Sequence, residues 1–245
     1  MMVAQSRDND ILSGYHHVRR MELALSFLRK VIKNSKEVAH ILDVGCGDGL
    51  FDELVCREIQ LPFEIVGMDI SPLRIKRAKK RIPNCSFVAA DIYHLPFKSV
   101  FNVIIMGEVL EHLHSPRIAL KKVREVLRQK GHLIIDTPSK SNIIDMFLRL
   151  IGHEPTWGLR IERTHVAFYD EESLRGLIRS SGFEIIDVSG VSFVRYDLLS
   201  HLAITWNKSR WWFPKLIDKI AEKFTALRSM GAIQVFLCQT TIAKS

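Results

Sequence analysis

Apolar residues follow two alternating spacings along most of the chain. Short runs rich in Ile and Val are followed by longer segments in which apolar residues recur every three or four positions. The runs predict strands and the longer segments predict helices, because these spacings place apolar side chains on one buried face. The predicted strands cover residues 40–44, 63–70, 86–92, 101–107, 132–138, 183–189 and 232–240. The predicted helices between them cover residues 50–60, 71–82, 115–131 and 169–182.

This order of elements predicts an α/β fold with a doubly wound, mostly parallel sheet. Near-continuous apolar strands are typical of parallel sheets that helices cover on both faces. No internal repeat, low-complexity tract or linker interrupts residues 1–245, so we expect a single domain. Two segments, 139–164 and 190–230, break the alternation and contain all four tryptophans. The core of the predicted sheet therefore contains no tryptophan.

A glycine-rich turn follows the first predicted strand. Residues 43–49 read DVGCGDG, and glycines let a backbone turn tightly and approach a ligand closely. Asp69 ends the second strand, where an acid can hold both hydroxyls of a ribose. Asp91 ends the third strand, where an acid can accept a hydrogen bond from an adenine amino group while Ile92 lies against the ring. Because the carboxyl ends of parallel strands share one edge, these residues predict a binding site for an adenosine-containing cofactor.

Five segments in order resemble the motifs of the Rossmann-like (class I) S-adenosylmethionine-dependent methyltransferases. They are LDVGCGDG (42–49), GMDIS (67–71), ADIYHLPF (90–97), FNVIIMGEVLEHL (101–113) and LRQKGHLIIDTP (127–138). The resemblance covers about residues 38 to 190 and implies S-adenosylmethionine as the cofactor. It also implies a seven-stranded sheet whose last strand runs antiparallel beside the fifth, a place that residues 232–240 fit.

The resemblance further implies which residues contact the cofactor. An N-terminal helix, at about residues 11–35, is similar to the segment that covers the cofactor in such enzymes. Either Arg19 or Arg20 of this helix can pair with the methionine carboxylate, while Asp43 and the glycines face the methionine part. The full set expected at the cofactor is Arg20, Asp43, Gly45, Cys46, Gly47, Gly49, Asp69, Ile70, Asp91, Ile92, Gly107 and Glu108.

The segment GEVLEHLH (107–114) follows the fourth strand, beside the expected reactive methyl group. On one turn of helix, Glu108, Glu111 and His112 would share a face. The pattern is similar to that of ubiquinone-biosynthesis O-methyltransferases and of small-RNA 2′-O-methyltransferases, whose two Glu and two His bind a divalent metal; His165 would be the second histidine. Three roles stay open: a metal site, a metal-free base at His112 or His165, and Glu108 facing the sulfonium. We favour the metal-free base and predict no bound metal.

The two segments that break the alternation are expected to roof the acceptor pocket. Both contain apolar helix candidates, and an amphipathic helix usually packs on its own core. The alternative is peripheral contact with a membrane, because Trp211, Trp212 and Phe213 stand between Arg210 and Lys215, as at a headgroup boundary. The ubiquinone enzymes that the chain resembles act on membrane-borne prenylated substrates. We therefore expect a small, largely apolar acceptor, such as a quinone or lipid precursor.

Charge and cysteine content add weaker expectations. The net charge of +8 leaves room for an anionic partner, but we expect the basic run in residues 71–82 to be a solvated face away from the acceptor pocket. An RNA methyltransferase and a non-catalytic cofactor-binding module are the alternative functions. The four cysteines form no C-x-x-C pair, which suits free thiols in a reducing compartment. Because the N-terminus does not read as a secretory signal, we expect a cytoplasmic protein.

Overall fold

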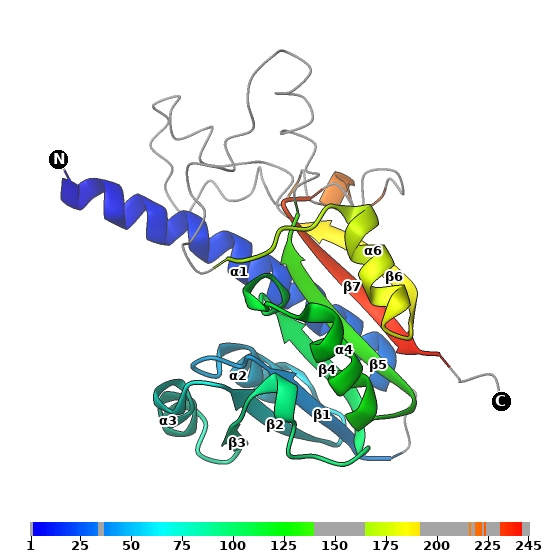
Figure 1. Cartoon of the computed structure of the whole chain (residues 1–245). Coiled ribbons are helices and arrows are strands. Elements are labelled where there is room, and N and C mark those ends of the chain that lie inside the picture. Colours follow the sequence, from blue (N-terminus) through cyan, green and yellow to red (C-terminus); the bar gives the residue numbers. More distant parts are fainter. Residues whose placement is uncertain are drawn as a thin grey trace.

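A seven-stranded sheet with helices on both faces forms the centre of the fold (Figure 1). The computed structural model describes residues 2–33, 37–139, 165–191, 216, 219–221, 223 and 231–241. The strands are β1 (Ala39–Val44), β2 (Phe63–Asp69), β3 (Ser86–Ala89), β4 (Phe101–Gly107), β5 (Leu127–Pro138), β6 (Phe183–Val191) and β7 (Ile233–Thr240). They lie in the order β3-β2-β1-β4-β5-β7-β6, and β7 runs antiparallel to both of its neighbours. The predicted doubly wound sheet, with its antiparallel last strand beside the fifth, is confirmed.

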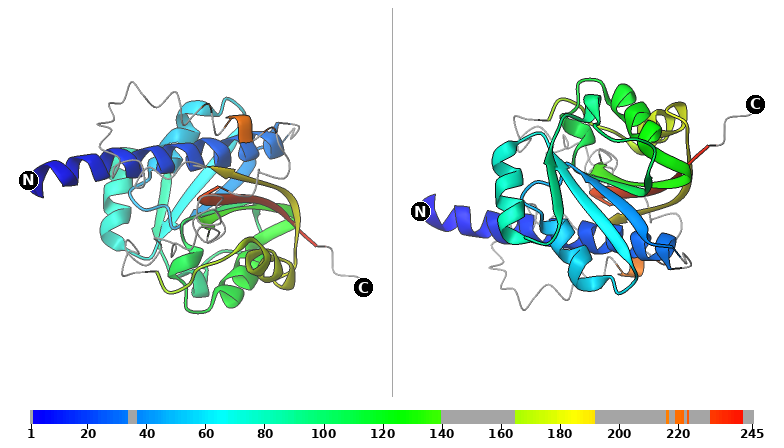
Figure 2. Two further views of the ribbon diagram at one scale, coloured as in Figure 1. Left: turned by 90° about the horizontal axis from the view of Figure 1, so that it is seen from above. Right: turned by 90° about the horizontal axis from the view of Figure 1, so that it is seen from below.

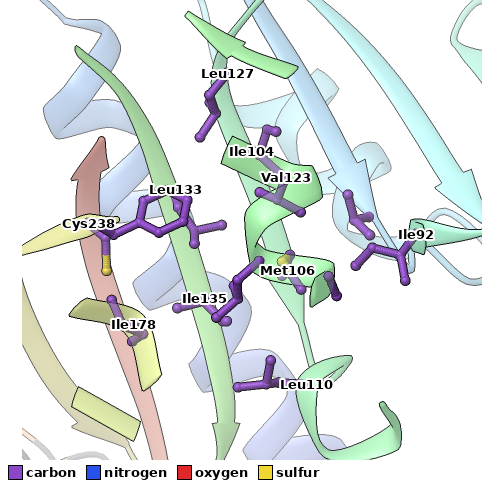
Figure 3. Packing of buried hydrophobic residues seen from close by; sticks show 14 of the residues in the cluster. Ile92, Ile104, Met106, Leu110, Val123, Leu127, Leu133, Ile135, Ile178 and Cys238 are labelled. Carbon is purple, nitrogen blue, oxygen red and sulfur yellow. The ribbon is translucent and has the colours of Figure 1, made fainter. Parts of the chain in front are cut away.

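Helices cover both faces of this sheet and divide its core in two. The described helices are α1 (Met2–Ile32), α2 (Leu50–Glu58), α3 (Pro72–Arg81), α4 (Pro116–Val126) and α6 (Glu171–Ser180), with short 3-10 helices η1 (Ile92–His94) and η2 (Leu110–His112). On one face, Leu28 of α1 and Val55 of α2 pack with Ile41 of β1. On the other face, Val123 of α4 and Ile178 of α6 belong to the core cluster that Figure 3 shows.

Local sequence explains where two of these helices begin. The Ser71 hydroxyl accepts a hydrogen bond from the Arg74 backbone N–H, and Pro72 occupies the first turn of α3. Asp170 accepts from the Ser173 N–H at 2.8 Å, and the Ser173 hydroxyl accepts from the Asp170 N–H at 3.1 Å. This reciprocal cap fixes the start of α6 directly after the segment that carries His165.

The boundary between α4 and β5 differs from the prediction. The helix expected over residues 115–131 ends at Val126, and β5 begins at Leu127, which is buried and pairs with Phe101. After this pair the register with β4 shifts, so most of the predicted last helical turn forms a bulge in which Lys130 has a φ of 59°. Burial of Leu127 against the sheet stabilises the chain more than another exposed turn of helix would.

The N-terminal helix is present and begins earlier than expected. Instead of covering about residues 11–35, α1 starts at Met2 and crosses the sheet (Figure 2), with its apolar side chains in the same core as α2. The two expected roof segments, 139–164 and 190–230, lie mostly outside the described residues, so their contacts with an acceptor or a membrane stay predictions. Among the helices that the structure describes, none is both long and apolar enough to cross a bilayer.

Candidate functional site

A cavity of about 800 Å³ lies at the carboxyl edge of the sheet, beside α1. Its walls come from α1, the glycine turn after β1, the ends of β4 and β5, and the first turns of α2 and α3. Nine residues of the predicted site line it: Arg20, Asp43, Gly45, Cys46, Gly47, Gly107, Glu108, His112 and His165. The other five predicted residues, Gly49, Asp69, Ile70, Asp91 and Ile92, are not part of this lining. The structure therefore brings the expected methionine-side residues and both candidate bases into one cavity.

The glycine turn depends on backbone conformations that side chains disfavour. Gly45, Gly47 and Gly49 have φ values of 76°, 57° and 80°. A Cβ on Gly45 would lie 2.3 Å from Cγ2 of Val109, so only glycine fits between the turn and the segment after β4. A Cβ on Gly47 would meet only Arg74 Nη1, at 3.7 Å. The space beside Gly47 is thus open, which fits a ligand that approaches the backbone closely.

Asp69, the expected ribose acid, holds the glycine turn in place. Its Oδ2 accepts a hydrogen bond from the Gly47 N–H at 3.0 Å, and its Oδ1 accepts from the Ser71 N–H at 2.8 Å. The side chain is buried, although each carboxylate oxygen has a second lone pair. The structure therefore gives Asp69 a positioning role between β1 and β2, and its contact with a ribose stays a prediction.

The expected adenine residues lie at the same edge of the sheet. Asp91 caps η1 by accepting from the Tyr93 N–H at 2.9 Å, and its side chain is 40% exposed. Ile92 is buried in the core cluster on the face of the sheet that α4 and α6 cover. Ile70, directly after β2, is 73% exposed. An exposed apolar side chain at a strand end suits packing against a ring, so Ile70 is the better placed of the two isoleucines.

Arg20 is the centre of a charged network that closes one side of the cavity. Its Nη1 lies 3.3 Å from both carboxylate oxygens of Asp136, and its Nη2 lies 3.0 Å from Glu108 Oε2. Glu108 Oε2 is also 3.1 Å from His17 Nδ1, and the Glu108 N–H donates to Asp136 Oδ1 at 3.1 Å. Arg19 instead pairs with Glu22 along α1. Of the two arginines left open by the sequence, Arg20 is the one that lines the cavity.

This network shifts the pKa values of its members in different directions. Burial raises the pKa of Asp136 to about 6, although Arg20 acts in the opposite direction. Burial would also raise the pKa of Glu108, but the hydrogen bond with His17 and the charge of Arg20 bring it below its ordinary value. The hydrogen bond with Glu108 raises the pKa of His17. Sequence reasoning missed Asp136, whose signal was an acid at the end of an otherwise apolar strand.

A pair of buried acids lies behind the glycine turn. Asp43 on β1 and Asp52 on α2 are 4% and 0% exposed, and their carboxyl groups are in hydrogen-bonding contact. Neither oxygen of Asp52 has a well-formed hydrogen bond within the described residues, so burial favours the protonated form of the pair. Burial raises the pKa of Asp52 to about 6 and that of Asp43 well above its ordinary value. Asp52 was missed, although an acid between Phe51 and Val55 on an apolar helix face is unusual.

Three potential ligand groups meet at the end of β4. A carboxylate oxygen of Glu111 and one ring nitrogen each of His112 and His165 lie within 4.8 Å of one another. The centroids of the two imidazole rings are 4.8 Å apart. The N–H groups of Val166 and Ala167 donate to the Glu111 carbonyl at 2.9 and 3.1 Å, which ties this segment to η2. The expected return of residues 162–168 over the fourth strand is therefore seen in its described part. One carboxylate oxygen and two imidazoles form a donor set that suits a divalent metal.

Glu108 does not join this cluster, so of the alternatives left open by the sequence it is not on one face with Glu111 and His112. The backbone at Glu108 has a φ of 52°, which interrupts helical geometry before η2 and turns its side chain toward Arg20. Glu111 is 2% exposed; its Oε2 accepts from the Thr137 hydroxyl at 3.2 Å, and its Oε1 has no hydrogen bond within the described chain. Burial raises the pKa of Glu111 to about 8.

Two arginines of α3 also reach the cavity. Arg74 and Arg77 belong to its lining, and Arg77 Nη1 is 3.7 Å from Asp48 Oδ2. Both side chains are exposed, as expected of a solvated face, and whether they lie near the acceptor stays open. The Arg74 Nη1 atom would be 3.7 Å from a Cβ on Gly47, so this guanidinium lies beside the glycine turn.

Comparisons with known proteins agree with this geometry. A family model described as a methyltransferase domain matches residues 15–188. An uncharacterized protein of Methanocaldococcus jannaschii is 35% identical over 121 residues, which are 49% of each chain. A ubiquinone biosynthesis O-methyltransferase of Cereibacter sphaeroides is 30% identical over 64% of this chain and 65% of its own length. The chain thus spans about half to two thirds of the length of these relatives.

Solved structures share the fold at lower identity. A Haloferax volcanii protein named as a putative methyltransferase, in complex with the Trm112 methyltransferase activator, has a TM-score of 0.64 at 15% identity, covering 98% of this chain and 96% of that one. The N-methyltransferase NodS of Bradyrhizobium japonicum, in complex with S-adenosyl-L-homocysteine, has a TM-score of 0.52 at 17% identity, covering 89% of this chain and 86% of that one. The chain therefore belongs to the methyltransferase-domain family, within the Rossmann-like class of S-adenosylmethionine-dependent methyltransferases.

Proposed function

We propose that the protein transfers a methyl group from S-adenosylmethionine to a hydroxyl of a small, largely apolar acceptor, such as a quinone or lipid precursor. The observation that carries the proposal is a single cavity lined by Arg20 and by the imidazoles of His112 and His165. A charged group for the cofactor and a proton acceptor for the substrate thus share one space. The likeness to a ubiquinone biosynthesis O-methyltransferase supports a quinone-like acceptor.

The cavity suits the charges of the proposed cofactor. S-adenosylmethionine supplies a methyl group on a positively charged sulfonium, so the protein mainly binds and orients. Arg20 would pair with the methionine carboxylate, and Glu108 and Asp136 would favour the nearby positive charges. Asp69 and Asp91 would hold the ribose and the adenine amino group at the neighbouring strand ends. Alignment of donor and acceptor by such contacts can supply about 7–11 kcal/mol of the barrier.

His165 or His112 would remove the proton from the acceptor hydroxyl. Both line the cavity, and a neutral imidazole accepts a proton in the range in which enzymes operate. The His165 ring lies 5.7 Å from the Phe168 ring, and the hydrogen bonds from Val166 and Ala167 to η2 fix the backbone beside it. His165 is therefore held on a short, well-anchored segment, and we propose it as the base.

A divalent metal is the alternative at the same place. Glu111, His112 and His165 would hold it, and it would orient an acceptor hydroxyl and lower the pKa of that hydroxyl. We favour the metal-free base because Glu108, the fourth ligand of the resembling enzymes, is engaged by Arg20 and His17. A complete four-ligand set would require Glu108 to leave both partners.

One labelling experiment tests the acceptor class. The purified chain is incubated with methyl-labelled S-adenosylmethionine and with the lipid, small-molecule and RNA fractions of a cell extract. We expect label in the lipid or small-molecule fraction, and its loss in His165→Ala. Label confined to RNA would support the second candidate, an RNA methyltransferase, which Arg74 and Arg77 at the cavity favour. No transfer to any fraction, despite cofactor binding, would contradict both.

A further inference from the structure

The fold brings together two cysteines that the sequence leaves apart. The sulfur atoms of Cys56, in the last turn of α2, and Cys85, directly before β3, lie 3.1 Å from each other across 29 residues of chain. Both thiols are free and half-buried, whereas Cys46 and Cys238 are buried. The expected free thiols are thus found, and α2 brings two of them together at the start of β3.

The surroundings of Cys85 make its thiol less acidic. Burial raises the pKa of Cys85 to about 12. The hydrogen bond with Cys56 and the charge of Asp52, which is on the same helix as Cys56, act in the same direction. When Cys56 is a thiolate, the protonated Cys85 can donate a hydrogen bond to it across the 3.1 Å between the sulfur atoms. A thiolate formed at Cys56 would accept that hydrogen bond, and the thiolate is the form of cysteine that reacts with oxidants.

We propose that Cys56 and Cys85 form an oxidisable dithiol site, which hydrogen peroxide converts into a disulfide. The Cys56 thiolate attacks one peroxide oxygen, the O–O bond breaks, and hydroxide leaves, so Cys56 becomes a sulfenic acid. The Cys85 sulfur then attacks the Cys56 sulfur, the S–O bond breaks, and the proton of Cys85 leaves with the oxygen as water. In total, two thiols and one peroxide give one disulfide and two waters.

The geometry needs little rearrangement to form this bond. A disulfide has a sulfur–sulfur distance of about 2.05 Å, so the sulfur atoms approach by about 1 Å. The bond would join α2 to the start of β3, at the edge of the sheet opposite the cavity, whereas Leu50 and Phe51 line the cavity from the other end of α2. Oxidation therefore stabilises the folded chain and leaves the cofactor site intact.

Peptide mapping of the full chain tests the site directly. The reduced protein is treated with hydrogen peroxide, its remaining thiols are alkylated after unfolding, and its peptides are separated without reductant. We expect a Cys56–Cys85 cross-link, with Cys46 and Cys238 alkylated. We also expect a rise in Tm of about 5 °C or more that dithiothreitol reverses, and a Kd for S-adenosylhomocysteine within about twofold of the reduced value.

Two variants make the outcome decisive. Cys56→Ser should leave Cys85 uncross-linked and abolish the rise in Tm, and Cys85→Ser should leave a sulfenic acid on Cys56 that a sulfenic-acid-specific reagent traps. The proposal is overturned if peroxide leaves both thiols alkylatable, or if the cross-links involve Cys46 or Cys238 equally. It is also overturned if the cross-linked chain melts at a lower temperature than the reduced one. None of these results depends on the identity of the methyl acceptor.

Discussion

Arg20 of α1 contacts Asp136 at the end of β5 across 116 residues, with Nη1 3.3 Å from both carboxylate oxygens. Asp136 is 2% exposed, and a buried carboxylate without a cation is costly. The contact therefore fixes α1 at the mouth of the cavity. It also presents a guanidinium to the space where the methionine carboxylate is proposed to bind.

Arg20→Ala should weaken both folding and cofactor binding. Removal of the guanidinium leaves Asp136 and Glu108 without their shared cation, so the free energy of unfolding should fall by roughly 2–4 kcal/mol. The Kd for S-adenosylhomocysteine, measured by calorimetry, should rise at least tenfold.

Two other changes on α1 are matched controls for Arg20→Ala. Lys30→Ala breaks a 2.8 Å ion pair with Asp187 in which the lysine side chain is 51% exposed, so it should cost at most about 1 kcal/mol. Arg19→Ala should leave the Kd for S-adenosylhomocysteine unchanged. An equal loss of affinity in Arg19→Ala and Arg20→Ala would refute the choice of Arg20.

Gly45→Ala should destabilise the chain and reduce cofactor affinity. The new Cβ would lie 2.3 Å from Cγ2 of Val109, at a φ of 76° that alanine rarely adopts. We expect a loss of about 2 kcal/mol or more in urea unfolding. Gly176→Ala is the control, because its Cβ would meet nothing within 4 Å and lies inside α6. It should stabilise the chain by about 0.5–1 kcal/mol, and a similar result at Gly45 would show that the turn tolerates a side chain.

The Asp43–Asp52 pair should make stability depend on pH. Burial raises the pKa of Asp52 from 3.8 to about 6 and that of Asp43 well above its ordinary value, so the folded state binds both protons more tightly than the unfolded state. The stabilisation is complete below about pH 4; the part due to Asp52 is lost as the pH rises through about 6, and the part due to Asp43 is lost at higher pH.

Asp52→Asn should flatten that dependence, because its amide N–H donates to Asp43 at every pH. Urea midpoints between pH 4 and pH 8 measure the effect. We expect wild type to lose stability relative to Asp52→Asn across this window. Glu53→Gln, the next residue on α2 and paired with Arg81 at the surface, should leave the dependence unchanged. A constant difference between wild type and Asp52→Asn at all pH values would mean that folding does not raise the pKa of Asp52.

The sequence predicted the sheet better than it predicted the site, and particular residues show why. The strands followed from their apolar runs, because strands of a buried parallel sheet are apolar on both faces, and the place of the last strand followed from the resemblance to the family. The end of α4 was misplaced because the burial of Leu127 is a tertiary effect. Of the two places left open for Glu108, the one beside Arg20 is occupied, because of a φ of 52° that cannot be read from GEVLEHLH. Asp136 and Asp52 were missed because a lone acid reveals its burial and its partner only after folding.

His165→Ala and metal removal together separate the two mechanisms proposed for the cluster at the end of β4. If His165 is a metal-free base, chelation with EDTA should leave the methylation rate unchanged, whereas His165→Ala should lower it about 10²–10⁴-fold. If the cluster holds a metal, chelation should abolish activity, and added divalent metal should restore it.

Glu111→Gln is a second, independent test of whether the cluster holds a metal or acts through a metal-free base. Burial raises the pKa of Glu111 to about 8, so at neutral pH its carboxyl is mostly protonated and carries no charge. Glutamine is also neutral and can keep the hydrogen bond from Thr137, so a metal-free enzyme should retain activity within about tenfold. A metal would instead displace the proton, so its binding should strengthen as the pH rises toward 8, and Glu111→Gln should remove both the metal and the activity. Retained activity in Glu111→Gln, combined with its loss in His165→Ala, would assign the proton transfer to the histidine alone.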